Sequence, residues 1–162
     1  MSISFTGSEL INKAISIEKK GVTFYDTIGK SNKSAETREL FKYLADTERE
    51  HIKIFQDMLT QVGSSEVSWT SPQEYSSYLH ALINNAVFTE DKVTSEKATQ
   101  AEYLFEALEL AIGAEKDSIL FYNEMKDRIP KQAQETVNRI IIEEKSHLEK
   151  LSLLRNKLKS PV

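Results

Sequence analysis

Two repeated motifs constrain the fold of this chain more than any other feature. Residues 14–25 read AISIEKKGVTFY and residues 111–122 read AIGAEKDSILFY, and half of these positions are identical. Residues 44–55 (LADTEREHIKIF) and residues 140–151 (IIIEEKSHLEKL) form a second matching pair when their histidines are aligned. Each half of the chain therefore contributes the same set of polar residues, in the same order, to the folded structure.

Each half contains one glutamate and, further along, a Glu-x-x-His sequence. The six residues are Glu18, Glu48 and His51 in the first half and Glu115, Glu144 and His147 in the second. Residues three apart lie on one face of a helix. Apolar residues such as Leu44 and Phe55 share that face with the Glu-x-x-His residues. The spacing therefore predicts that the six polar side chains point into the core of a helical bundle.

Apolar residues recur at helical spacing along most of the chain, and only five Gly and three Pro interrupt them. We expect long helices over about residues 10–30, 34–63, 94–128 and 130–159, and a short helix over about 72–84. Thr6 and Glu9 have the spacing of a capping box, and Ser34 can cap the second helix. This order predicts an all-α four-helix bundle made of two helical hairpins joined by a long crossover, in a single domain over residues 1–162.

Composition excludes several kinds of function. The net charge is −4 and no block of Lys and Arg stands out, so we expect no nucleic-acid partner. No apolar run approaches the roughly 18–20 residues of a membrane span, and the first residues lack a secretory signal, so we expect a cytoplasmic protein with no membrane partner. The absence of Cys excludes disulfides, iron–sulfur clusters and thiol nucleophiles.

Four carboxylates and two imidazoles in one core need compensation, because an unpaired buried charge is costly. Two divalent metals would balance the four carboxylates, each metal taking one histidine, one terminal glutamate and a share of two bridging glutamates. Mixed carboxylate and imidazole ligands suit iron or manganese better than tetrahedral zinc. The alternative is a relic repeat whose glutamates form salt bridges, for which Lys19 and Lys116 are the candidate partners.

Three other residues near the motifs need an interpretation. Glu50 and Glu143 adjoin the proposed ligands, but the spacing to histidine and the alignment of the halves favour Glu48 and Glu144. Glu143 lies close enough to share the ligand face, and we expect it to support a ligand or to face solvent. His80 lies in the short predicted helix without a glutamate three residues earlier, so we expect a surface or packing role.

Tyr25 and Tyr122 each follow a glutamate of the repeat by seven residues, which is two helical turns. Each tyrosine would then lie on the same face as that glutamate, beside the metals. A buried tyrosine hydroxyl needs a hydrogen-bond partner, and a ligand carboxylate would serve. The sequence leaves this role and plain core packing open, and it makes both tyrosines candidate catalytic residues.

The phrases AISIEKKGVTFY, LADTEREH, AIGAEKDSILFY and IIIEEKSH resemble the ferritin-like superfamily, and more specifically the rubrerythrin-type diiron proteins. The resemblance spans about residues 8–157. It implies a ferritin-like bundle with two iron ions, or manganese or a mixed pair in their place. It further implies that Glu18 and Glu115 are terminal ligands, that Glu48 and Glu144 bridge the metals, and that His51 and His147 each bind one metal.

The resemblance also implies an oxidoreductase that reacts Fe(II) with hydrogen peroxide or dioxygen, often in defence against oxidative stress. Two departures matter. Rubrerythrins usually carry a Cys-rich rubredoxin-like domain, so this Cys-free chain would need an external electron-donor protein. They also carry a seventh carboxylate where this chain has Ser118, whose repeat partner is Gly21. A more symmetric six-ligand site, closer to bacterioferritin-like centres, is therefore expected.

Two other functions stay open from the sequence. One is a ferroxidase that stores or delivers iron, and the other is a non-enzymatic helical module with a vestigial metal site. The long crossover favours a homodimer, in which hairpins could be exchanged between chains.

Overall fold

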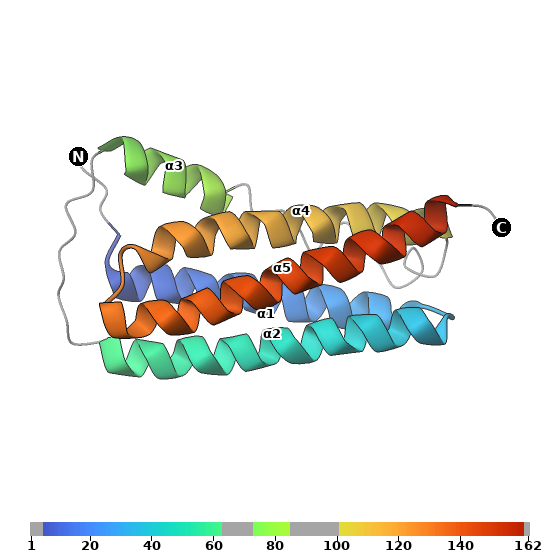
Figure 1. Ribbon diagram of the computed structural model, residues 1–162, viewed down its shortest axis with the longest axis horizontal. Coiled ribbons are helices and arrows are strands. Elements are labelled where there is room, and N and C mark those ends of the chain that lie inside the picture. The colour runs from blue at the N-terminus through green and yellow to red at the C-terminus, as the bar shows by residue number, and fades with distance from the viewer. Residues whose placement is uncertain (1–4, 63–72, 85–100, 161–162) are drawn as a thin grey trace.

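The chain folds into helices throughout the part that the structure describes (Figure 1). The structure is a computed structural model that describes residues 5–62, 73–84 and 101–160. Its helices are α1 (Gly7–Ser31), α2 (Ala35–Val62), α3 (Gln73–Asn84), α4 (Ala101–Lys126) and α5 (Lys131–Lys159). The expected all-α fold and the expected order of helices are confirmed. The expected start of the third long helix near residue 94, and the expected stop at Gly63, lie outside the described residues.

The four long helices form two hairpins, α1 with α2 and α4 with α5. Helices α1 and α5 run in one direction along the bundle, and α2 and α4 run in the other (Figure 1). Because α2 and α4 are parallel, the chain between them must return from one end of the bundle to the other. This return is the predicted long crossover, and it includes α3, which packs against α4.

Local side-chain bonds define where the first two helices begin. The backbone N–H of Glu9 donates to Oγ1 of Thr6 at 3.2 Å, and the N–H of Thr6 donates to Oε2 of Glu9 at 2.7 Å. This is the capping box that the sequence predicts. At the start of α2, the N–H of Thr37 donates to Oγ of Ser34 at 3.4 Å, which confirms the second predicted cap.

The apolar core consists of two clusters, one toward each end of the bundle. One cluster includes Leu10, Ile11, Phe55, Met58, Phe121, Tyr122, Val137 and Ile140. The other includes Phe24, Tyr25, Ile28, Phe41, Leu44, Leu108, Ala111 and Leu151. On each long helix the buried glutamates and histidines fall between the segments that supply these two clusters. The bundle therefore holds a polar layer between two apolar ones.

Gly29 allows α1 to approach α2 closely beside the second cluster. A Cβ atom at Gly29 would lie 3.3 Å from Cβ of Phe41, which is tighter than ordinary van der Waals contact.

None of the helices in the described ranges combines the length and the apolar character needed to cross a membrane.

Truncation of a core residue should show how much the second cluster contributes to stability. Phe41 is fully buried and its ring centroid lies 5.7 Å from that of Tyr25, so Phe41→Ala should lower the free energy of unfolding by about 3–5 kcal/mol. The matched control is Ile142→Ala, because Ile142 is 64% exposed and its loss should change stability by less than about 0.5 kcal/mol. Urea unfolding followed by circular dichroism measures both. Equal effects of the two substitutions would contradict this description of the core.

Candidate metal centre

All six residues of the repeated pattern lie in the polar layer, near the middle of the four long helices. Glu18 is on α1, Glu48 and His51 are on α2, Glu115 is on α4, and Glu144 and His147 are on α5. Each is at least 96% buried, since none exposes more than 4% of its surface. The i,i+3 spacing places each Glu-x-x-His pair on the inner face of its helix, as the sequence predicts.

Their ligand atoms form two groups that share two residues. Glu18, Glu48, His51 and Glu144 make one group, and Glu48, Glu115, Glu144 and His147 make the other. Within each group the ligand atoms all lie within 4.8 Å of one another. Because Glu48 and Glu144 belong to both groups, the arrangement can hold two metal ions with two carboxylates between them.

In both groups the histidine presents Nδ1 to the carboxylates. Nδ1 of His51 lies 2.9 Å from Glu144, 3.5 Å from Glu18 and 3.7 Å from Glu48. Nδ1 of His147 lies 3.3 Å from both Glu48 and Glu144, and 3.6 Å from Glu115. The two rings are nearly parallel, with their centroids 6.1 Å apart. The centre therefore has the approximate two-fold symmetry of the sequence repeat.

Several of these converging atoms lack a hydrogen bond. Oε2 of Glu18, Oε1 of Glu144 and Nδ1 of both His51 and His147 are buried and have no hydrogen-bond partner in the described part of the chain. A buried polar atom that stays unpaired costs about 1–3 kcal/mol. Oxygen and imidazole nitrogen donors that face one another in this way fit a pair of cations, and the mixed donor set suits iron or manganese.

The electrostatics of the metal-free centre depend on its protons. Burial and the nearby charge of Glu144 raise the pKa of Glu48 and of Glu115 well above its usual range. Burial acts in the same direction on Glu144, but contacts with Glu115, His147 and His51 outweigh it and lower the pKa of Glu144. Without metal, protons therefore have to balance the buried carboxylates.

The histidines hold part of this balancing charge. Burial alone would lower the pKa of His147, but its contacts with Glu115, Glu144 and Glu48 raise that pKa to about 12. The pKa of His51 is raised in the same way, since Glu144, Glu18 and Glu48 outweigh the effect of burial. Both imidazoles are therefore charged near neutral pH when no metal is bound.

Two tyrosine hydroxyls hold Glu18 and Glu115 in place, the glutamates that each belong to one group only. Tyr25 on α1 donates to Oε1 of Glu115 on α4, and Tyr122 on α4 donates to Oε1 of Glu18 on α1. Each tyrosine thus bonds the glutamate of the opposite repeat, and not the glutamate seven residues before it. Burial, together with the neighbouring carboxylates, raises the pKa of both tyrosines well above 10. The sequence left open whether these tyrosines bond a carboxylate or only pack in the core, and the structure shows the hydrogen bond to a carboxylate.

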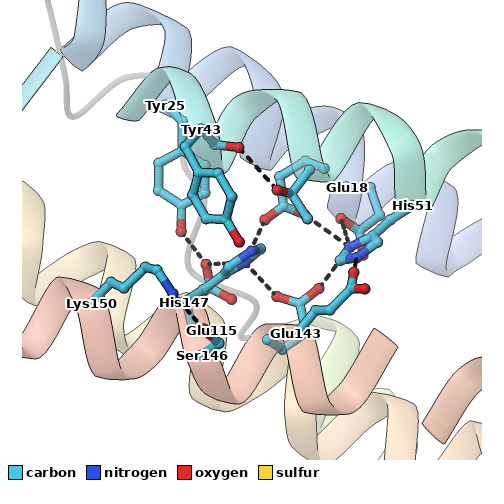
Figure 2. Close-up of polar contacts among 12 residues, drawn as sticks. Glu18, Tyr25, Tyr43, His51, Glu115, Glu143, Ser146, His147 and Lys150 are labelled. Atoms are coloured by element: carbon cyan, nitrogen blue, oxygen red, sulfur yellow. Dashed lines mark hydrogen bonds and ion pairs between the residues drawn. The ribbon is translucent and has the colours of Figure 1, made fainter. Parts of the chain in front are cut away.

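Glu143 also contacts the centre, from its outer side. Figure 2 shows this side chain extending from α5 to the ring of His51 on α2, where Nε2 of His51 donates to Oε2 of Glu143 at 2.6 Å. The sequence placed Glu143 beside a ligand or in solvent, and the structure combines the two, because the side chain is 51% exposed. The two consecutive glutamates before His147 indicated that Glu143 could lie near the ligands. They did not indicate that its partner would be His51, the histidine of the other repeat.

The remaining candidates lie outside the centre. His80 is half-buried and its ring centroid lies 4.6 Å from that of Phe5, which agrees with the expected packing role. Lys19 and Lys116 are exposed, and neither forms an ion pair with the buried glutamates of the described ranges. The salt-bridge alternative to a metal site therefore lacks its proposed partners.

The two positions discussed for a seventh carboxylate are both buried. Ser118 is 6% exposed, and a Cβ at Gly21 would lie 3.4 Å from Cγ of Glu48. Neither residue offers a carboxylate, so four glutamates and two histidines make up the two groups of candidate ligands.

Comparisons with known proteins agree with this geometry. A sequence model of the rubrerythrin family matches residues 9–155. A solved structure described as a ferritin-like diiron-carboxylate protein, from Thermotoga maritima, matches with a TM-score of 0.68 and 29% sequence identity. The match covers 94% of this chain and 95% of the other. No match was found among the curated proteins. The resemblance stated from the sequence, including the ferritin-like fold, is confirmed.

Metal binding should become tighter as pH rises. In the metal-free centre the pKa of His147 is about 12, so a divalent metal must displace a proton from the imidazole at any pH below that value. Raising the pH lowers the cost of this displacement, and the apparent affinity rises. Calorimetric titration with Mn(II) at about pH 6 and about pH 7.5, in buffers of different ionisation enthalpy, measures both affinity and proton release. A pH-independent affinity would show that the centre does not hold these protons.

Removal of one tyrosine hydroxyl should destabilise the metal-free protein. Tyr25→Phe leaves Oε1 of Glu115 without its donor in a fully buried position, at an expected cost of about 1–3 kcal/mol. Tyr78→Phe is the matched control, because Tyr78 is 43% exposed and water can replace its contacts. Urea unfolding in the presence of a chelator compares the two variants. If Tyr25→Phe were as stable as the control, the hydroxyl would have no role in holding Glu115.

Proposed function

Because the chain belongs to the rubrerythrin family, we propose that it is a non-haem diiron redox protein that reacts Fe(II) with hydrogen peroxide or dioxygen. One observation carries this proposal: the two groups of buried ligand atoms share Glu48 and Glu144. Carboxylates shared in this way can bridge two metal ions, whereas two separate metal sites would share no ligands. Glu18 and Glu115 would be the terminal ligands, and His51 and His147 would each bind one ion.

When bound, two Fe(II) ions would supply two electrons to the oxidant. Reduction of hydrogen peroxide to two water molecules consumes these two electrons and two protons. The four buried glutamates offset the charge of the metals in a layer from which the two apolar clusters exclude bulk water. Tyr25 and Tyr122 keep their protons because their pKa values are raised, so their hydroxyls continue to donate to Glu115 and Glu18 and fix these carboxylates in place.

The electrons must be returned to the centre after each reaction. The sequence contains no Cys, so it offers no thiolate-bound iron or disulfide that could store them. We therefore assign the reduction to an external electron-donor protein, and a role in defence against oxidative stress would follow. A homodimer stays part of the proposal, as the long crossover suggests.

A ferroxidase function is the second candidate. The observation that favours it is the pair of positions Gly21 and Ser118, which leaves the centre with matching ligands on both sides. Iron oxidation with release of the product needs no external donor. Consumption of the donor therefore separates the two functions.

Anaerobic titration with Fe(II), followed by a pulse of peroxide or dioxygen, tests the proposal. We expect two Fe(II) per chain and a near-ultraviolet absorbance band of the oxidised centre, formed faster with peroxide if the protein is a peroxidase. Glu48→Gln should abolish the band, because it alters a carboxylate that belongs to both groups. Glu50→Gln is the matched control, since Glu50 is an exposed glutamate on the same helix. A wild-type protein that bound neither iron nor manganese would refute the dinuclear assignment. The remaining alternative would then be a helical module with a vestigial metal site.

A further inference from the structure

The two halves of the centre differ at one aligned position. Glu143 directly precedes Glu144 in the second half, whereas Thr47 directly precedes Glu48 in the first. The six candidate ligands are identical between the aligned halves, whereas the residue at this neighbouring position differs. The consequence falls on the histidines, because Glu143 reaches His51 of the opposite half.

Glu143 fixes the ring of His51. A carboxylate can only accept a hydrogen bond from an imidazole nitrogen, so the 2.6 Å contact means that Nε2 of His51 carries the proton and donates it. Nδ1 is then left to face Glu144, Glu18 and Glu48. The bond fixes the orientation of the ring before any metal arrives, and it holds the proton on Nε2, so that Nδ1 is the nitrogen that gives up its proton to a metal.

His147 has no equivalent support. The hydroxyl of Thr47 donates to the backbone oxygen of Tyr43, one turn earlier in its own helix, at 3.0 Å. Nε2 of His147 is buried and has no hydrogen-bond partner among the described residues. The ring instead has the edge-on ring of Tyr43 beside it, with centroids 6.0 Å apart. A ring contact of this kind selects neither a tautomer nor a single orientation.

We propose that the two metal positions are unequal, and that the position with His51 and Glu18 binds the first divalent metal because Glu143 preorganises it. This inference rests on the proposed dinuclear centre and goes beyond it. Loss of a hydrogen-bond partner behind a metal-binding histidine typically costs about 10–100-fold in affinity. The two dissociation constants should therefore differ by about that factor, and a half-loaded protein should accumulate during titration. Glu143 is a positioning residue, since it acts through His51.

Anaerobic titration with Mn(II), followed by electron paramagnetic resonance and calorimetry, tests the inference without turnover. The wild-type protein should bind one Mn(II) tightly and a second about 10–100-fold more weakly, with the signal of a coupled pair arising only in the second step. Glu143→Ala should weaken the tight step by about the same factor and bring the two steps together. Glu143→Gln keeps an acceptor oxygen and should restore part of the difference. Glu50→Ala removes an exposed neighbouring carboxylate and should leave both steps unchanged.

Two further variants identify which position fills first. His147→Ala should keep the tight step and lose the weak one, whereas His51→Ala should do the reverse. Thr47→Glu places a carboxylate at the position aligned with Glu143, where it would offer His147 a partner, and it should tighten the second step. Circular dichroism confirms that each variant is folded.

The outcomes separate this inference from the function on which it rests. Two equal steps in the wild-type protein, or a tight step that Glu143→Ala leaves unchanged, would overturn the inequality while leaving the dinuclear centre intact. A loss of the tight step in His147→Ala would reverse the assigned order and overturn the role of Glu143. A wild-type protein that binds no metal at all would remove the proposed centre itself.

Discussion

The buried charge between the helices is the constraint on which the rest of this structure depends. Four glutamates and two histidines lie in the polar layer, where water cannot solvate them. Nδ1 of each histidine lies 2.9–3.7 Å from carboxylate oxygens, which is too close for independent charges, and neither Nδ1 has a hydrogen-bond partner among the described residues. The fold tolerates this layer because apolar clusters on either side hold the four helices together. Protons can balance the negative charge of the carboxylates. Two metal ions would balance the same charge and would also bind the oxygen and nitrogen atoms that face one another.

The fold could be predicted almost completely, because the signals for it are local. The apolar periodicity located the helices, and the capping box predicted at Thr6 and Glu9 is present at the start of α1. The inward direction of the six polar residues followed from their three-residue spacing and apolar neighbours. The repeat then indicated that the two halves meet, which no periodicity within one helix could show.

The contacts between helices were harder to predict, because they depend on the axial offset of one helix against another. Spacing along the chain relates Tyr25 only to Glu18 in its own helix, so the bond to Glu115 on α4 could not be predicted from it. Glu143 is a clearer case. Its partner His51 lies on a helix of the other hairpin, and only the packed structure places the two side chains 2.6 Å apart.

The division of the candidate ligands between the two hairpins has a consequence for assembly. Each group of ligand atoms draws residues from both hairpins: Glu144 of the second hairpin completes the group around His51, and Glu48 of the first completes the group around His147. Neither hairpin alone can form either group. A bound metal would therefore join the two hairpins as a crosslink does, at the middle of the long helices. The two groups of ligand atoms are therefore complete only in a chain whose two halves have docked in register.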